Sequence, residues 1–94
     1  MRVEEVIWLD NVVEKLAIKH RVIPVEVEEV LRNRPRFWFA AKGNQPGENV
    51  YLALGRTDSG RYLTVLFIYK PPAQALILSA RDMATKERKR YGRT

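Results

Sequence analysis

The segment Leu76-Ile-Leu-Ser-Ala-Arg-Asp-Met-Ala-Thr-Lys-Glu-Arg-Lys-Arg-Tyr91 begins as an apolar run and ends as a strongly basic one. Its first part is typical of a β-strand, and its second part is expected to form a basic helix, which Arg93 would extend. Ser79 and Arg81 stand where the strand would leave the core. A helix held by a sheet in this way can present positive charge to a polyanion from a rigid base. The segment therefore predicts a binding surface.

The residues before this segment predict a series of strands. The tetrapeptide Thr57-Asp-Ser-Gly60 predicts a hairpin turn, and Lys70-Pro-Pro72 ends a strand because proline cannot donate to a β ladder. Several breakers in Lys42–Gly47 predict a loop. In the last strand we expect Ser79 and Arg81 to share a face with Ile77. The predicted strands are Val3–Leu9, Phe37–Phe39, Glu48–Arg56, Arg61–Tyr69 and Ala75–Ala80.

Two helices are predicted between the first strand and the others. Asn11 and Glu14 have the spacing of a capping box, and the apolar residues that follow have a helical period, with His20 at the far end. Pro24 is a favourable first residue for a second helix, which Asn33 is expected to end. The element order is then β-α-α-β-β-β-β-α. This order predicts an α+β fold with an antiparallel β-sheet, two N-terminal helices on one face and one C-terminal helix.

Composition limits the classes of partner and cofactor. The 94 residues predict one domain, 1–94, and a net charge of +6 with a pI near 10.0 favours an anionic partner: a nucleic acid, an acidic protein or a membrane surface. The longest apolar run, Leu63–Tyr69, is too short for a membrane helix, so we expect no membrane partner. The absence of cysteine fits a reducing, cytoplasmic setting. One histidine and no cysteine cannot form an ordinary transition-metal site, and no phosphate-binding loop motif is present. We therefore expect neither a metal nor another cofactor.

Short motifs along most of the chain resemble those of the BrnT-type toxins. In order, they are Trp8-Leu-Asp10, Lys19-His20, Gly55-Arg56, Gly60-Arg61, Ser79-Ala-Arg81, Glu87-Arg88 and Tyr91. That family consists of small ribonuclease components of type II toxin-antitoxin modules and is related in fold to the RelE toxins. The resemblance implies the same architecture, RNA as the substrate and a cognate BrnA-like antitoxin that binds DNA and represses the operon. The sequence is also compatible with assembly into a homo-oligomer.

The sequence departs from the family's pattern at two positions. Arg21 stands where the family usually has glycine after its Lys-His pair, and Leu76 stands where it usually has arginine in the last strand. The second difference removes a cation from the neighbourhood of the expected site. Whether Leu76 abolishes activity is a question that the sequence leaves open.

Cleavage of RNA without a metal needs a base for the 2′-hydroxyl, an acid for the departing 5′-oxygen and cations for the phosphorane. His20 is the candidate for proton transfer, because histidine titrates near neutral pH. A packed or helix-capping histidine is the alternative. Arg81 is the candidate phosphate clamp; an ion pair with Glu87 or Asp82 is its alternative.

Arg61 is the third catalytic candidate, and Arg56 is expected to face it across the hairpin. Two like charges placed opposite each other are unfavourable unless an anion lies between them, although Asp58 or Glu48 could neutralise either one. Ser79 could bond the same phosphate or cap the following helix.

Other cations and two aromatic residues complete the candidate surfaces. A basic helix would give salt-sensitive affinity for RNA, whereas the alternative is a solvated helix face. Trp38 is expected on the opposite strand face from its Phe neighbours, as a partner-binding or base-stacking residue. Tyr91 could stack on a base, bind a partner or anchor the helix to the sheet. The cations predicted to bind RNA, besides Arg56, are Lys70, Lys86, Arg88, Lys89 and Arg90.

The sequence therefore favours a metal-independent ribonuclease toxin in which Arg81, Arg56 and Arg61 hold the phosphate and His20 transfers a proton. The alternative is a non-catalytic module on the same scaffold that binds nucleic acid or a protein partner. Leu76 in place of a cation, and a buried position for His20, would favour that alternative.

Overall fold

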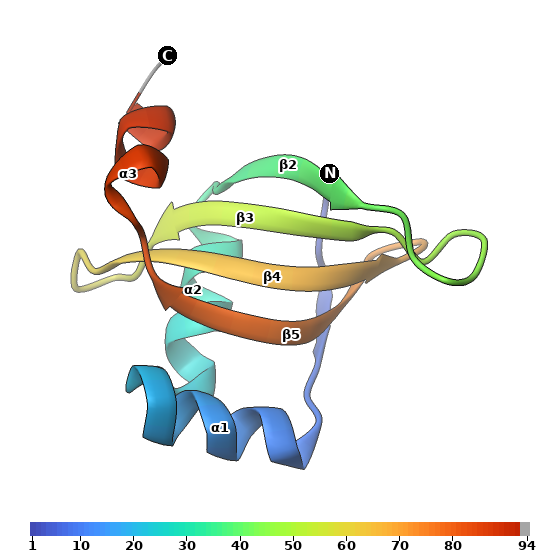
Figure 1. Ribbon diagram of the computed structural model, residues 1–94, viewed down its shortest axis with the longest axis horizontal. Helices are drawn as coiled ribbons and strands as arrows, with labels where there is room; N and C mark the ends of the chain where they lie inside the picture. Colours follow the sequence, from blue (N-terminus) through green and yellow to red (C-terminus); the bar gives the residue numbers. More distant parts are fainter. Residues whose placement is uncertain (93–94) are drawn as a thin grey trace.

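The computed structural model describes residues 1–92 (Figure 1). Arg93, which the sequence predicts as part of the basic helix, lies outside the described residues. The elements in chain order are β1 (Glu5–Ile7), α1 (Asp10–His20), α2 (Pro24–Arg32), β2 (Arg36–Ala41), β3 (Val50–Arg56), β4 (Tyr62–Lys70), β5 (Gln74–Asp82) and α3 (Thr85–Gly92). The predicted α+β fold and its element order are confirmed.

The five strands form one sheet in the order β1-β5-β4-β3-β2. Strands β2 to β5 pair antiparallel in sequence order, as short turns and loops between them require. The short strand β1 pairs parallel with β5, with Val6 opposite Ala75, so the sheet is mixed. The connection from β1 to the far edge of the sheet contains both α1 and α2. In Figure 1, α2 lies behind the sheet and α1 lies below β5.

The core lies between one face of the sheet and these two helices. Apolar residues at helical spacing in α1 and α2 meet the inward-pointing residues of β3, β4 and β5. The strand β4 supplies the centre of the layer because it is apolar on both faces. The buried core residues are Val12, Leu16, Val22, Val27, Val30, Leu31, Ala53, Leu63, Val65, Phe67, Ala75, Ile77 and Ala80.

A β-bulge in β5 determines which face receives the polar end of that strand. Phe67 of β4 pairs with Ile77, whereas the preceding residue, Leu66, pairs with Ser79, so one extra residue is accommodated between the two pairs. Beyond the bulge, Arg81 pairs with Thr64. The expectation that Ser79 and Arg81 share a face with Ile77 was wrong, because the extra residue moves both side chains to the face away from the helices.

Several element boundaries also differ from the sequence prediction. Helix α1 begins at Asp10 with Leu9 as its N-cap and no side-chain cap, so the capping box predicted at Asn11 does not form. The Leu9 carbonyl accepts the first helical hydrogen bonds, which places Asn11 inside the helix. Strand β5 continues to Asp82 and α3 starts at Thr85, so Ser79 is not a helix cap. The predicted roles of Pro24 and Asn33 at the two ends of α2 are confirmed.

No helix in residues 1–92 has both the length and the apolar composition needed to cross a membrane.

Gly55 of β3 allows α2 to lie close to the sheet. A Cβ atom at this position would be 3.0 Å from Val30 Cγ1 and 3.1 Å from Pro35 Cβ, which is tighter than ordinary packing.

We expect Gly55→Ala to lower the free energy of unfolding by about 1–2 kcal/mol, as overpacking does in a close-packed core. Denaturant titration measures the change. Gly92→Ala is the control, since no atom lies within 4 Å of its added Cβ, and an equal loss in that variant would contradict the packing explanation.

Candidate active site

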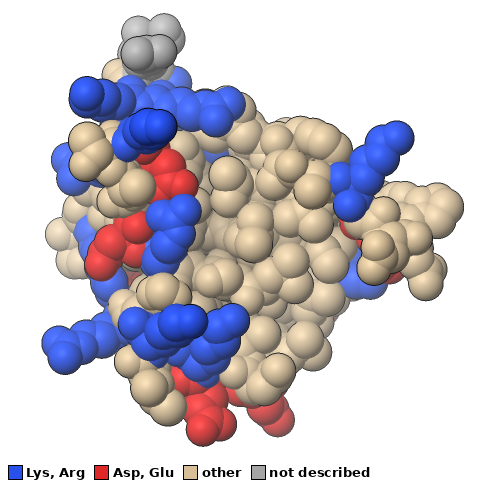
Figure 2. Space-filling model, in the orientation of Figure 1, with Lys and Arg blue, Asp and Glu red and all other residues tan. Residues whose placement is uncertain are grey.

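The face of the sheet opposite α1 and α2, called the open face below, carries the candidate site. Its centre is apolar and half-buried, and the same face appears as the broad tan area in Figure 2. Lys and Arg side chains gather around the border of this area, most densely on the side where α3 stands, with acidic side chains among them. The open face therefore combines a neutral floor with a largely basic rim. The residues of its floor include Leu52, Leu66, Ile68 and Leu76.

A bidentate ion pair between Arg81 of β5 and Glu87 of α3 connects the sheet to the C-terminal helix. Arg81 Nη1 lies 2.7 Å from Glu87 Oε1, and Arg81 Nη2 lies 2.8 Å from Glu87 Oε2. The same carboxylate accepts hydrogen bonds of 2.8 Å from the Thr64 hydroxyl and from the Ala84 amide. The Ala84 contact is one half of a capping box at the start of α3. The Glu87 carboxylate is thus bound by donors from β4, from β5 and from the N-terminal end of α3.

The electrostatics of this cluster exclude Glu87 from proton transfer near neutral pH. The Arg81 guanidinium, helped by the Ala84 amide and the Thr64 hydroxyl, lowers the pKa of Glu87 to about 2. Glu87 in turn raises the pKa of Arg81. Both groups stay charged throughout the physiological range. The pair can bind an anion or orient a group, but it cannot supply an acid or a base there.

A hollow of about 180 Å³ opens beside this pair. Its floor is apolar and its edge carries two hydroxyl groups and a guanidinium; the lining residues are Leu52, Thr64, Leu66, Ser79 and Arg81. Hydrogen bonds of the Thr64 hydroxyl and the Arg81 guanidinium go to Glu87. Thr64 is not among the site residues predicted from the sequence; the available signal was its small polar side chain between the apolar residues Leu63 and Val65.

Helix α3 rests on the open face through guanidinium and ring contacts. Arg88 lies 3.6 Å from the centre of the Tyr62 ring, and Arg90 lies 4.2 Å from that of Trp38. Tyr91 packs edge-on against Tyr62 at 5.9 Å between ring centres, so Tyr91 anchors the helix. Such cation–π contacts stabilise an exposed helix by about 0.5–1 kcal/mol each. No residue of α3 is buried, so this helix is docked by its surface alone.

Arg56 joins the same rim, but it does not face Arg61 as the sequence suggested. Arg56 pairs with Tyr62 across the ladder and lies 5.6 Å from that ring, because the hairpin turn places Thr57 opposite Arg61. The hydrogen bond and charge of Tyr62 raise the pKa of Arg56. The expected pair of opposed arginines was therefore wrong.

Arg61 is occupied by contacts that hold the helices to the sheet. Its guanidinium donates to the Asp82 carboxylate at 2.8 Å and to Glu26 at 3.2 Å. It also donates to the backbone carbonyls of His20 at 3.1 Å and Arg21 at 2.8 Å. The hydrogen bond that Arg61 donates to Asp82 raises the pKa of Arg61 and lowers that of Asp82. Arg61 thus joins the ends of α1, α2, β4 and β5.

His20 lies in the Arg61 cluster and is not part of the lining of the hollow. Its backbone carbonyl accepts from Arg61, which also bonds Asp82, and after the larger effect of Arg61 the charge of His20 adds to the lowering of the Asp82 pKa. Asp82 directly follows Arg81 in β5. The two clusters therefore meet at the end of one strand, with Arg81 on the open face and Asp82 on the side of His20.

The remaining predicted cations are divided between the two ends of the sheet. Lys86 and Lys89 are exposed on α3, beside Arg88 and Arg90. Lys70 forms a 3.0 Å ion pair with Glu48 at the far end of β4, about 25 Å along the strand from Tyr62. Lys70 is thus remote from the hollow.

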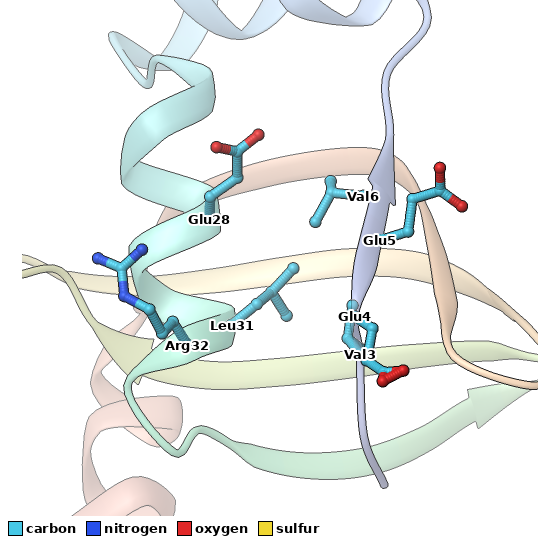
Figure 3. A pocket seen from close by; sticks show the side chains of 7 residues that line it. All are labelled: Val3, Glu4, Glu5, Val6, Glu28, Leu31 and Arg32. Carbon is cyan, nitrogen blue, oxygen red and sulfur yellow. The ribbon is translucent and has the colours of Figure 1, made fainter.

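A larger hollow, of about 400 Å³, lies beside the rim, where Arg56 and Tyr91 contribute to its lining. Two more lie on the side of α2 and the N-terminal segment. One of about 430 Å³ between α2 and β1 has Val6 and Leu31 facing each other. Its lining also includes Glu4, Glu5, Glu28 and Arg32, with the Glu5 carboxylate pointing to the side of β1 away from Leu31 (Figure 3). These carboxylates would repel a polyanion. Within residues 1–92, no group of three or more His, Asp or Glu side chains is placed to hold a metal ion.

Comparison with known proteins gives one family and one fold. The family described as "Ribonuclease toxin, BrnT, of type II toxin-antitoxin system" matches residues 8–87. The crystal structure of the Brucella abortus ribonuclease toxin BrnT is similar, with a TM-score of 0.63 and 14% sequence identity over 88% of this chain and 100% of that chain. At this identity the likeness concerns the fold. No curated protein matches the chain.

The depressed pKa of Glu87 predicts an acid-sensitive attachment of α3. A carboxylate whose pKa falls from 4.5 to about 2 on folding stabilises the protein above pH 4.5, and this stabilisation disappears as the pH falls towards 2. Between about pH 5 and pH 2.5 we expect the wild type to lose about 1–2 kcal/mol more unfolding free energy than Glu87→Gln, after allowance for solvent screening. Urea titrations of both proteins at each pH measure the difference, and parallel curves would contradict the assignment.

The contacts of Arg61 predict a structural effect. Arg61→Ala is expected to lower the unfolding free energy by about 2 kcal/mol, because charged hydrogen bonds to Asp82, Glu26 and two carbonyls are lost together. Arg32→Ala is the control: its 3.3 Å ion pair with Asp58 is exposed, and its loss should cost no more than about 0.5 kcal/mol. Thermal denaturation of the two variants gives the comparison. Equal melting temperatures would mean that the Arg61 contacts stabilise nothing.

Proposed function

Because this chain belongs to the BrnT family of ribonuclease toxins of type II toxin-antitoxin systems, we propose that it is a cytoplasmic endoribonuclease that cleaves RNA on its open face. The position of Arg81 is the observation that supports this proposal best. Its guanidinium lies at the edge of a hollow, beside two hydroxyl groups, and arginine side chains of α3 and β3 lie along the rim. A guanidinium so placed suits the two non-bridging oxygens of a phosphodiester.

In the proposed reaction, the ribose 2′-oxygen attacks its own phosphate and the bond from phosphorus to the 5′-oxygen breaks. A base takes the 2′-hydroxyl proton, an acid supplies a proton to the 5′-oxygen, and the products are a 2′,3′-cyclic phosphate and a 5′-hydroxyl. Arg81 neutralises the charge that develops on the phosphorane. No metal ion takes part in this proposal.

We assign proton transfer to His20 and a positioning role to Arg61. Arg61 donates to the His20 carbonyl at 3.1 Å, which holds the end of α1 against the end of β5. For this assignment the imidazole has to reach the 2′-hydroxyl next to the phosphate at Arg81, around the end of β5 where Asp82 stands. Arg61 would then act on catalysis through the position of His20.

The rim cations would attract the RNA backbone. Arg56, Arg88 and Arg90 lie over aromatic rings, and Lys86 and Lys89 extend from the exposed face of α3. Neutralising several phosphates releases bound counterions, so affinity would fall steeply with salt. Lys70, at the far end of β4, could contact only an RNA long enough to cross the whole open face.

A cognate antitoxin would neutralise the protein by covering the open face. The half-buried floor around Leu52, Leu66 and Ile68 offers apolar contact area, and the rim favours an acidic partner segment. Trp38 and Tyr91 lie at its border: the Trp38 ring is covered by the Arg90 guanidinium, and Tyr91 packs edge-on against Tyr62.

The test is cleavage of RNA by the purified protein in EDTA. The wild type should produce fragments with 2′,3′-cyclic phosphate ends, and Arg81→Ala should be at least about 100-fold slower, as expected for loss of a charge-stabilising donor. His20→Ala should lose a factor of about 100 to 10,000 if it transfers the proton. Lys15→Ala is the control, because it removes an exposed cation from α1, which is not part of the open face.

A second outcome would identify the non-catalytic alternative. The bidentate pairing of Arg81 with Glu87 favours that alternative, since a paired guanidinium is less available to a reacting phosphate. Wild-type protein that retards RNA on a gel but leaves it intact would show a binding module. Cleavage that depends on added metal would contradict the metal-free reaction.

A further inference from the structure

Four hydrogen bonds converge on the carboxylate of Glu87. Its Oε1 accepts from Arg81 Nη1 at 2.7 Å, from the Thr64 hydroxyl at 2.8 Å and from the Ala84 amide at 2.8 Å. Its Oε2 accepts from Arg81 Nη2 at 2.8 Å. A guanidinium, a hydroxyl and an amide at a helix N-terminus are also the donors that proteins use for phosphate. We call these three donor residues, Arg81, Thr64 and Ala84, the anion cradle.

The occupant of the cradle resembles a phosphodiester in charge and shape. Glu87 has a pKa of about 2 and is ionised at neutral pH, so it carries one negative charge over two oxygens. A phosphodiester also carries one negative charge over two non-bridging oxygens, and both groups accept the two parallel hydrogen bonds of an arginine fork. One can therefore replace the other without leaving the guanidinium unpaired.

We propose that Glu87 occupies the binding site of an RNA phosphodiester in the free protein and that RNA displaces it from the cradle. The inference rests on the proposed function, because it identifies the groups that receive the substrate's phosphate there. Arg81 and Thr64 belong to both the cradle and the lining of the hollow. A phosphate in the cradle would consequently place its attached nucleoside at the hollow.

Solvent exposure makes the exchange physically accessible. The Arg81 side chain keeps 43% of its surface exposed, whereas the Glu87 side chain keeps 19%. An incoming anion can therefore approach the guanidinium from the open face before the carboxylate leaves. A pair sealed on both sides would allow no such approach.

The weak attachment of α3 allows Glu87 to leave. Glu87 lies in the first turn of α3, and no residue of this helix is buried. The other contacts of α3 with the sheet include the guanidinium groups of Arg88 and Arg90 over aromatic rings and the edge contact of Tyr91, all at the surface. Displacement of Glu87 thus requires a small shift of a surface-docked helix and leaves the core intact.

The test measures affinity for an RNA oligonucleotide with 2′-O-methyl groups, which cannot be cleaved. If Glu87 competes with phosphate, Glu87→Gln should bind this RNA about fivefold to tenfold more tightly, a change that corresponds to about 1–1.4 kcal/mol. Glu87→Asp should also bind more tightly, because its shorter side chain releases Arg81 while the net charge is unchanged. Fluorescence anisotropy at constant salt, with folding checked by circular dichroism, gives the affinities.

Two controls separate this effect from general electrostatics. Glu14→Gln makes the same charge change on the exposed side of α1 and should alter the affinity less than twofold. In an Arg81→Ala background the gain from Glu87→Gln should vanish, because nothing is left for the carboxylate to block. A gain that persists without Arg81 would overturn the proposal.

Unchanged or weaker binding by folded Glu87→Gln and Glu87→Asp would also overturn it, and would leave the ion pair with a purely structural role. The affinities are independent of catalysis, since the RNA cannot react. Absence of cleavage by the wild type would therefore refute the ribonuclease proposal and leave the competition result standing. Tighter binding by the variants with no cleavage would identify a phosphate site in a binding protein.

Discussion

The ion pair between Arg81 and Glu87 joins the sheet to the C-terminal helix and fixes the arrangement of the proposed site. Without it, the sheet would end at Asp82 and α3 would be an exposed basic segment with no buried residue. The pair sets the position of α3 over the open face, which places Arg88 and Arg90 on Tyr62 and Trp38. It also holds the guanidinium of Arg81 beside the hollow. One contact thus defines both the rim and the proposed phosphate site.

Two arginines of similar appearance in the sequence have different roles because their surroundings differ. Arg61 lies between α1, α2 and β5 and donates to carboxylates and backbone carbonyls, so its charge is used within the fold. Arg81 meets one carboxylate and stays partly exposed to solvent on the open face. A phosphate can compete for the second guanidinium far more easily than for the first. Because Arg81 and Asp82 are consecutive residues of β5, their side chains point to opposite faces, so the anion cradle and the Arg61 cluster lie at the same end of the strand but on different sides.

The fold covers one face of its sheet with a helix at one end only, and the proposed function uses the rest of that face. The core is complete between the sheet and the two N-terminal helices, so the open face is free to combine an apolar floor with a basic rim. A flexible polyanion and a protein inhibitor can both use such a surface, since one needs the cations and the other needs the area. Competition between them for the same face is a direct way for an antitoxin to silence a toxin.

The sequence by itself determined the element order, the hairpin at Thr57–Gly60, the two ends of α2 and the family, because each depends on local conformation or on motifs in order. It also identified Arg81 and its possible pairing with Glu87. Only the tertiary structure decided that a bulge turns Ser79 and Arg81 to the open face, that Arg61 is held inside the fold, and that Thr64 belongs to the site. A single extra residue in a strand reverses the faces of all that follow, and the sequence pattern carries no separate mark of it. Which charges meet depends on such register, and register is settled when the whole sheet packs.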